Sequence, residues 1–119
     1  MPPLHPGRIF WAVFPEKRGD GKTRPMVAVN SRTDIVRTGV VAAIVCSTSF
    51  ARPLLADEVE LPSDPEGRSI TRLREATVAV CNWRAEIPHA SIDQIGGIIP
   101  TASLREICRK ANIPYASQR

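Results

Sequence analysis

The sequence has few residues of the kinds that metal sites, disulfide frameworks and membrane spans require. It contains two histidines and three cysteines, and no two cysteines form a CxxC pair. His5 and His89 are isolated, so we expect no metal ion and no cofactor. Cys46, Cys81 and Cys108 each lie among apolar residues, which predicts free buried thiols. No apolar run approaches the roughly 18 residues of a transmembrane helix, which argues against a membrane protein.

Lysine and aromatic residues are also scarce. Three of the 16 basic residues are lysines, which leaves 13 arginines, and the basic residues outnumber 12 acidic ones. Because a guanidinium is always charged and grips a phosphate through two parallel hydrogen bonds, this excess favours a polyanionic partner. Arginine richness can also reflect the codon usage of a GC-rich genome. With only 5% aromatic residues, we expect arginines rather than stacked rings to hold a nucleic acid.

The 119 residues are enough for a single domain, which we assign to residues 1–119. Apolar residues make up 43% of the chain and charged residues 24%, as in an ordinary globular protein. The proline-rich residues 1–7 lack the basic-then-apolar order of a signal peptide. We therefore expect a cytoplasmic protein.

Short apolar runs separated by turn residues favour a mainly β protein. Residues 63–67 have the composition of a turn, and the charged residues 16–23 that of a loop over a site. Six runs have the length and residue content of strands: 9–14, 25–29, 40–46, 58–61, 77–83 and 97–99. Together with one terminal helix, they predict an α+β fold in which a compact β-barrel packs against that helix.

The predicted helix lies near the C-terminus. Ser103 and Glu106 have the spacing of a capping box, which would start the helix at Ser103. Pro114 would stop it. The apolar stripe on one face of this helix comprises Leu104, Ile107, Cys108 and Ala111. Residues 68–76, which carry Arg68, Arg72 and Arg74, fit either a helical turn or a loop.

The first strand is apolar on both faces. Ile9, Trp11 and Val13 alternate with Phe10, Ala12 and Phe14. Trp11 and Phe14 could be read as stacking platforms for bases. We prefer the interpretation that one face enters the core and the other a subunit interface.

The N-terminal half resembles the MazF/PemK toxins. Residues 7–14 (GRIFWAVF), the Arg18-Gly19 pair and residues 23–29 (TRPMVAV) match the family's opening strand, glycine-containing loop and Arg-Pro entry into a valine-rich strand. A second block matches the family's hydroxyl pair after its third long strand, here Ser47-Thr48. A third and thinner block contains Arg84, Glu86 and residues 91–93, with an apparent insertion at residues 67–76 before it. The resemblance implies an SH3-like, PemK-like barrel.

This resemblance also implies a function. MazF/PemK proteins are toxins of type II toxin–antitoxin systems, act as homodimers, and cleave single-stranded RNA without metal to leave a 2′,3′-cyclic phosphate and a 5′-hydroxyl. A cognate antitoxin with an acidic, flexible segment would occupy a basic RNA groove.

The chemistry of such cleavage selects candidate residues. Arg24, preceding Pro25 at the start of a strand, suits the charge of a phosphorane, and the hydroxyl of Ser47 or Thr48 could donate to a phosphate oxygen. Glu86 and Arg84, two residues apart on one face, could supply a general base and a second phosphate contact. Candidate RNA contacts come from residues near these: Arg18, Lys22, Arg52 and His89, of which His89 is also an alternative proton carrier.

Two other functions remain open from the sequence. A toxin of the same fold could poison DNA gyrase, for which a catalytic arginine and hydroxyl pair are unnecessary. The chain could also be a catalytically silent nucleic-acid-binding barrel, because Ser47 replaces the commoner threonine of the family.

Overall fold

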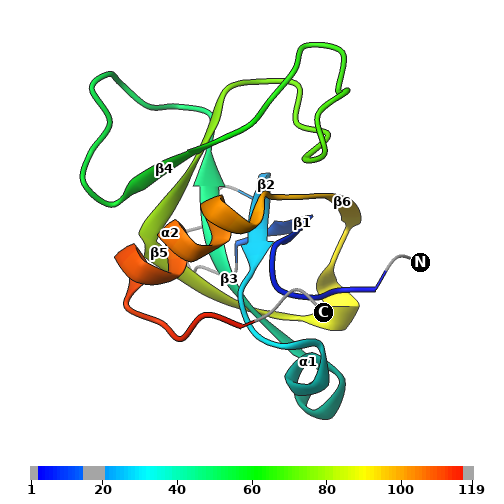
Figure 1. Cartoon of the computed structure of the whole chain (residues 1–119). Helices are drawn as coiled ribbons and strands as arrows, with labels where there is room; N and C mark the ends of the chain where they lie inside the picture. Colours follow the sequence, from blue (N-terminus) through cyan, green and yellow to red (C-terminus); the bar gives the residue numbers. More distant parts are fainter. Residues whose placement is uncertain (1–2, 15–20, 117–119) are drawn as a thin grey trace.

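The computed structural model describes residues 3–14 and 21–116. Within them, six strands form one antiparallel sheet in the order β4-β5-β3-β2-β1-β6, which curls into a half-barrel (Figure 1). The strands are β1 (Arg8–Val13), β2 (Thr23–Ala28), β3 (Val40–Ser47), β4 (Glu58–Leu61), β5 (Thr77–Pro88) and β6 (Gln94–Ile98). The helices are α1 (Arg32–Thr38), α2 (Thr101–Ala111) and the short 3-10 turn η1 (His89–Ser91). The predicted mainly β fold with a C-terminal helix is confirmed.

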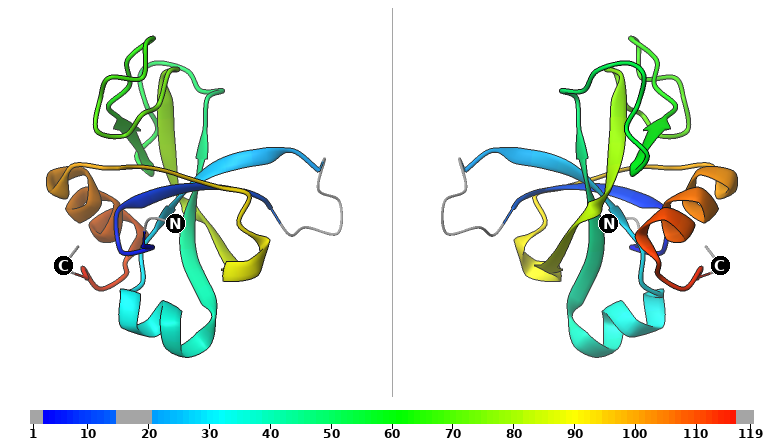
Figure 2. Two further views of the ribbon diagram at one scale, coloured as in Figure 1. Left: turned by 90° about the vertical axis from the view of Figure 1, so that its right-hand side faces the viewer. Right: turned by 90° about the vertical axis from the view of Figure 1, so that its left-hand side faces the viewer.

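The two ends of the sheet carry different elements. The loops of residues 48–57 and 62–76 gather at one end of β3 and β5, and α1 lies at the opposite end (Figure 2). All six predicted strand runs are present, although β5 continues five residues beyond its predicted end at Trp83 and β6 begins three residues before its predicted start and ends at Ile98. Of the predicted loop at 16–23, residues 16–20 lie outside the described part. No helix in the described ranges combines the length and apolarity needed to cross a membrane.

Both faces of the sheet are buried, each by its own cluster of apolar side chains. The α2-side cluster includes Ile9 of β1 together with Leu104 and Ile107 of α2. The α1-side cluster includes Phe10 and Ala12 of β1 together with other apolar residues of the sheet and Ile35 of α1. Phe10 and Ala12 are completely buried within the single chain. The face of Phe10 and Ala12 therefore belongs to the core of the single chain. On the other face Trp11 is half-buried and Val13 is exposed, so a subunit interface there stays a prediction.

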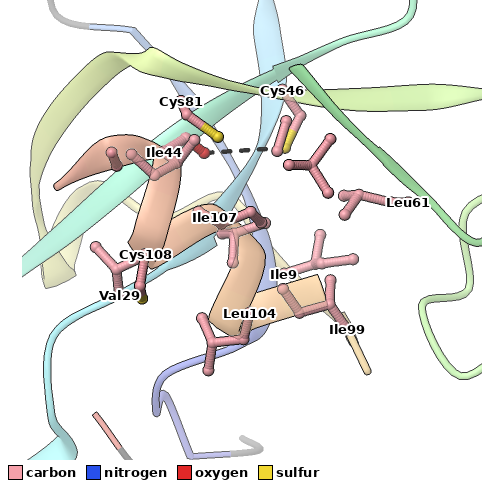
Figure 3. Close-up of a cluster of buried hydrophobic side chains, with 14 of the residues drawn as sticks. Ile9, Val29, Ile44, Cys46, Leu61, Cys81, Ile99, Leu104, Ile107 and Cys108 are labelled. Atoms are coloured by element: carbon pink, nitrogen blue, oxygen red, sulfur yellow. Dashed lines mark hydrogen bonds between the residues drawn. The ribbon is translucent and has the colours of Figure 1, made fainter. Parts of the chain in front are cut away.

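The three cysteines belong to the α2-side cluster. Cys46 and Cys81 lie on neighbouring strands β3 and β5, Cys108 projects from α2, and none forms a disulfide (Figure 3). Burial raises the pKa of the Cys81 thiol to about 11, and it raises the pKa values of Cys46 and Cys108 as well. The prediction of free buried thiols is confirmed. No group of metal-ligating side chains occurs among the described residues.

Native protein should leave these thiols unmodified. A raised thiol pKa lowers the thiolate fraction at pH 8, and burial blocks access of the reagent, so a thiol-reactive dye should label none of the three cysteines quickly. Addition of guanidinium chloride should expose all three. Rapid labelling of any cysteine in the folded state, with circular dichroism unchanged, would contradict this packing.

Helix α2 starts before its predicted first residue. It begins at Thr101 after Pro100, whose side chain makes no cap, so Ser103 lies inside the first turn. The predicted capping box is wrong, because Glu106 instead forms an ion pair with Arg109. The apolar stripe is confirmed, since all four of its members are buried: Leu104, Ile107, Cys108 and Ala111.

Helix α1 is absent from the sequence-based prediction. The Oγ of Ser31 accepts a hydrogen bond from the backbone N–H of Asp34 at 3.1 Å, and Gly39 ends the helix with φ +72°. These caps are a recognisable signal in the sequence. The helix was missed because Ile35 is its one buried residue, so no apolar stripe marks it.

Candidate nucleic-acid-binding groove

The pairing of β2 with β3 brings Arg24 and Ser47 together. Met26 lies opposite Val45 and Ala28 opposite Ala43, so the same register, continued by two residues, would place Arg24 opposite Ser47. Directly opposed residues of an antiparallel pair have their side chains on the same face, with Cβ atoms about 4.5–5.5 Å apart. The two residues are 23 positions apart in the chain. The recorded β2–β3 pairs end at Met26–Val45, and both Arg24 and Ser47 line one groove beyond them.

A groove of about 670 Å³ opens where β2 begins and β3 ends. Arg24 and Ser47 line it at one side, and the loop of residues 71–75 lines it at another. Among the described lining residues, four are basic (Lys22, Arg24, Arg72 and Arg74) and one, Glu75, is acidic. Its charge therefore suits an anionic ligand.

The hydroxyls of Ser47 and Thr48 differ in their hydrogen bonds. Ser47 Oγ accepts from the backbone N–H of Ser49 at 3.0 Å and donates to the carbonyl oxygen of Ser49 at 3.1 Å. Thr48 also lines the groove, is exposed, and follows the last residue of β3. Ser47 must rotate its proton away from Ser49 to donate to a ligand, whereas its position in the groove lining is fixed by the strand.

Aromatic side chains support Arg24. Its guanidinium carbon lies 5.3 Å from the ring centroid of Trp83, and Phe14 meets Trp83 edge to face with 5.4 Å between the ring centroids. A guanidinium held over a ring keeps its charge and loses conformational freedom. Trp83 is thus a supporting residue that the sequence did not single out, since it reads as one more strand aromatic.

The predicted RNA contacts have different positions. Lys22 lines the groove. Arg18 lies outside the described residues. Arg52 is outside the groove lining, and its guanidinium makes two hydrogen bonds to the carboxylate of Glu60 at 2.9 and 2.8 Å.

The structure does not bring Arg84, Glu86 or His89 to this groove. Arg84 and Glu86 do share a face, but they line a separate hollow beside Ile113. Glu86 pairs with Ala42, five residues and about 17 Å along β3 from Ser47. His89 lies further still, where its backbone N–H donates to the carbonyl oxygen of Gly39. The predicted shared face of Arg84 and Glu86 is present, but β5 carries both toward α1 and away from Arg24, so the roles assigned to these three residues stay predictions.

Solved structures with the same architecture are known. MazF from Deinococcus radiodurans superposes with a TM-score of 0.73 over 94% of this chain and 96% of its own, at 20% sequence identity. An endoribonuclease from a mycobacterial species, solved with its cognate antitoxin, gives a TM-score of 0.65 at 15% identity, covering 97% of this chain and all of its own. The Mycobacterium tuberculosis toxin MazF-mt6 gives 0.62 at 14% identity, covering 89% and 99%.

The chain has the MazF fold. No protein-family model matches the sequence, and neither does any curated protein. The likeness is therefore carried by the arrangement of strands and helices, and it extends over nearly the whole length of both chains. The resemblance predicted from the opening motifs is confirmed at the level of the fold.

Within this MazF fold, the segment at residues 67–76 adds groove residues that the sequence analysis did not assign. Arg72 and Arg74 line the groove, and Trp11 lines it from β1. The signal was present in the alternation of residues 71–74, in which Thr71 and Leu73 are buried and both arginines are exposed. Such an alternation usually indicates a strand, but this segment forms neither helix nor strand.

Proposed function

We propose that this protein is a MazF-type toxin that cleaves single-stranded RNA without a metal ion. The observation that carries the proposal is that Arg24 and Ser47 line one groove together with three further basic residues, Lys22, Arg72 and Arg74. Similar folds include a protein described as an endoribonuclease, which supports the same activity. By inhibiting translation in this way, the protein would arrest growth in the cytoplasm.

The proposed reaction uses the RNA's own 2′-hydroxyl. Its oxygen attacks the adjacent phosphorus, and the P–O5′ bond breaks, which leaves a 2′,3′-cyclic phosphate and a 5′-hydroxyl. Arg24 stabilises the extra negative charge of the phosphorane, and the hydroxyl of Ser47 or Thr48 donates to a non-bridging oxygen. The 2′ proton passes to water or to Glu75, which is the single carboxylate among the described groove residues. A proton from water completes the departing 5′ oxygen.

Two partners belong to the proposal. The first is an antitoxin whose acidic, flexible segment complements the basic groove; the support is the mycobacterial endoribonuclease of this fold, which was solved in complex with its cognate antitoxin. The second is another copy of this chain in a homodimer, for which the resemblance to the MazF/PemK toxins is the support.

Purified protein should cut RNA in the presence of EDTA. We expect unstructured RNA to yield fragments that end in a 2′,3′-cyclic phosphate, detected by mass spectrometry, at a rate that added EDTA does not lower. Folded protein that leaves RNA intact would overturn the nuclease proposal. Salt-sensitive RNA binding without products would indicate a silent binding barrel instead, and capture of gyrase without RNA cleavage would indicate a gyrase poison.

A further inference from the structure

The loop between β4 and β5 is fastened to the rest of the fold. The carbonyl oxygen of Ile70 accepts a hydrogen bond from the backbone N–H of Ile98 at 2.9 Å. The backbone of Ile70 and Thr71 also packs closely against Gly97 of β6. The Thr71 hydroxyl donates to the carbonyl oxygen of Pro62 at 2.6 Å. Thr71 and Leu73 are 1% and 4% exposed. The backbone that carries the intervening arginines is therefore fixed before any ligand arrives.

This anchored segment lines the groove through residues 71–75, and Arg72 and Arg74 are its two basic members. They alternate with the buried Thr71 and Leu73, and both line the groove that Arg24 and Ser47 line. Arg72 has φ +59°, a left-handed conformation that glycine adopts more easily than arginine. Such conformations persist where the surrounding structure holds them, and they cluster at ligand-binding positions.

The charges of Arg72 and Arg74 are unpaired within the described part of the chain. Neither side chain makes a hydrogen bond or an ion pair with any residue in the described ranges. Four arginines outside the groove, by contrast, are each paired with an acidic side chain: Arg37, Arg52, Arg68 and Arg109. Arg72 and Arg74 thus bring to the groove two positive charges that no described acidic side chain pairs with.

Arg8 adds to this charge behind the loop. One of its terminal nitrogens donates to the carbonyl oxygen of Gly96, a groove residue, at 3.1 Å, and its Nε is buried without a partner among the described residues. Burial, and then the nearby charge of Arg72, lowers the pKa of the Arg8 guanidinium. Like charges held this close favour an anion between or beside them.

We propose that Arg72 and Arg74 form a second phosphate-binding subsite, which holds a phosphate of the RNA strand that flanks the scissile one. The inference rests on the proposed RNA cleavage at Arg24 and Ser47. The N-terminal motifs assign no role to this loop. In the proposal, the loop adds a contact to single-stranded RNA further along the groove. The subsite contacts phosphate rather than bases, so it raises affinity without reading sequence.

The test compares Arg72→Gly with Arg74→Gln, singly and together. Glycine suits the backbone of residue 72, so a loss of fold is not expected there. Arg68→Gln is the matched control, because Arg68 is in the same loop but is paired with Glu66 and lies outside the groove lining.

Binding is measured with an RNA that carries a single 2′-deoxy nucleotide at a mapped cleavage site, over a series of salt concentrations. Cleavage is measured with a long oligonucleotide and with the dinucleotide of that site, which has one phosphodiester.

We expect the salt dependence of log K to fall by about 0.7 for each lost phosphate contact, and the KM for the long oligonucleotide to rise at least 10-fold in the double variant. Arg68→Gln should match wild type, and dinucleotide cleavage should be unchanged in all variants. Unchanged binding and KM in the double variant would overturn the subsite, as would an equal loss on the dinucleotide. If wild-type protein cleaves no RNA, binding is measured with the unmodified long oligonucleotide; a loss of salt-dependent binding in the double variant would then show that the nuclease function fails while a phosphate site at Arg72 and Arg74 remains.

Discussion

Replacing Arg24 with alanine should slow RNA cleavage by about 10²- to 10³-fold, which corresponds to about 2.7–4 kcal/mol of lost transition-state stabilisation. The guanidinium lies over the ring of Trp83, and Arg24 and Ser47 line the same groove. A preorganised charge of this kind acts on the phosphorane more than on the ground-state phosphate, so kcat should fall more than KM rises. The measurement is single-turnover cleavage of an oligonucleotide that contains one cleavage site.

Matched variants separate chemistry from folding in this experiment. Arg24→Lys keeps the charge but loses the two-pronged geometry, so it should recover a minor part of the rate. Arg109→Ala removes an arginine that is paired with Glu106 on α2, and it should cleave at the wild-type rate. An unchanged rate for Arg24→Ala would show that the assignment of this residue is wrong.

The same assay can identify the functional hydroxyl. If Ser47 acts with Arg24 on one phosphate, Ser47→Ala should cost much less in the Arg24→Ala background than in wild type, because the two effects are coupled. Thr48→Val should then be close to wild type. The reverse pattern would assign the hydroxyl to Thr48, which lies one residue beyond the strand.

Replacing Gly97 with alanine should cost about 3 kcal/mol of unfolding free energy or more. A Cβ atom at this position would lie 2.1 Å from the carbonyl oxygen of Ile70 and 2.5 Å from the carbonyl carbon of Thr71. Both neighbours are backbone atoms of the anchored loop, so they cannot move aside as a flexible side chain would. The loop must separate from β6, which breaks the Ile98–Ile70 hydrogen bond.

Gly96→Ala is the matched control for this prediction. Its added Cβ would meet the side chain and backbone of Ile9 at 3.3 Å, a tight but tolerable distance, so we expect a loss of about 1 kcal/mol. Urea denaturation of both variants supplies the free energies of unfolding. Equal stability of the two variants would contradict the close packing of residues 70–71 on Gly97.

Local patterns were sufficient for the strands and for the MazF-like opening. Alternation and β-branched runs located β1 to β4 to within two residues, because each run is bounded by turn residues or charged residues. The same logic failed for α1, whose single buried residue leaves no periodicity to detect. Local patterns also gave the wrong start for α2. The capping box pointed to Ser103, whereas the helix begins at Thr101, directly after Pro100.

The candidate site, too, was predicted in part from the sequence and decided in part by the tertiary structure. Arg24 and Ser47 were identified from residue type and position, but their meeting at one groove depends on the pairing of β2 with β3, which is a tertiary property. Arg84 and Glu86 were grouped with them on sequence alone, and the pairing of β5 with β3 moves them to another face and toward the other end. Arg72 and Arg74 were noted in the sequence, but no role could be assigned to them without the structure.

The sequence alone determined the residue types that this protein can use: arginines rather than histidines or metals, two adjacent hydroxyls, and apolar runs that must pair as strands. The tertiary structure decided which of them meet. It did so because strand register and sheet curvature, which depend on contacts between distant residues, set the neighbours of each side chain.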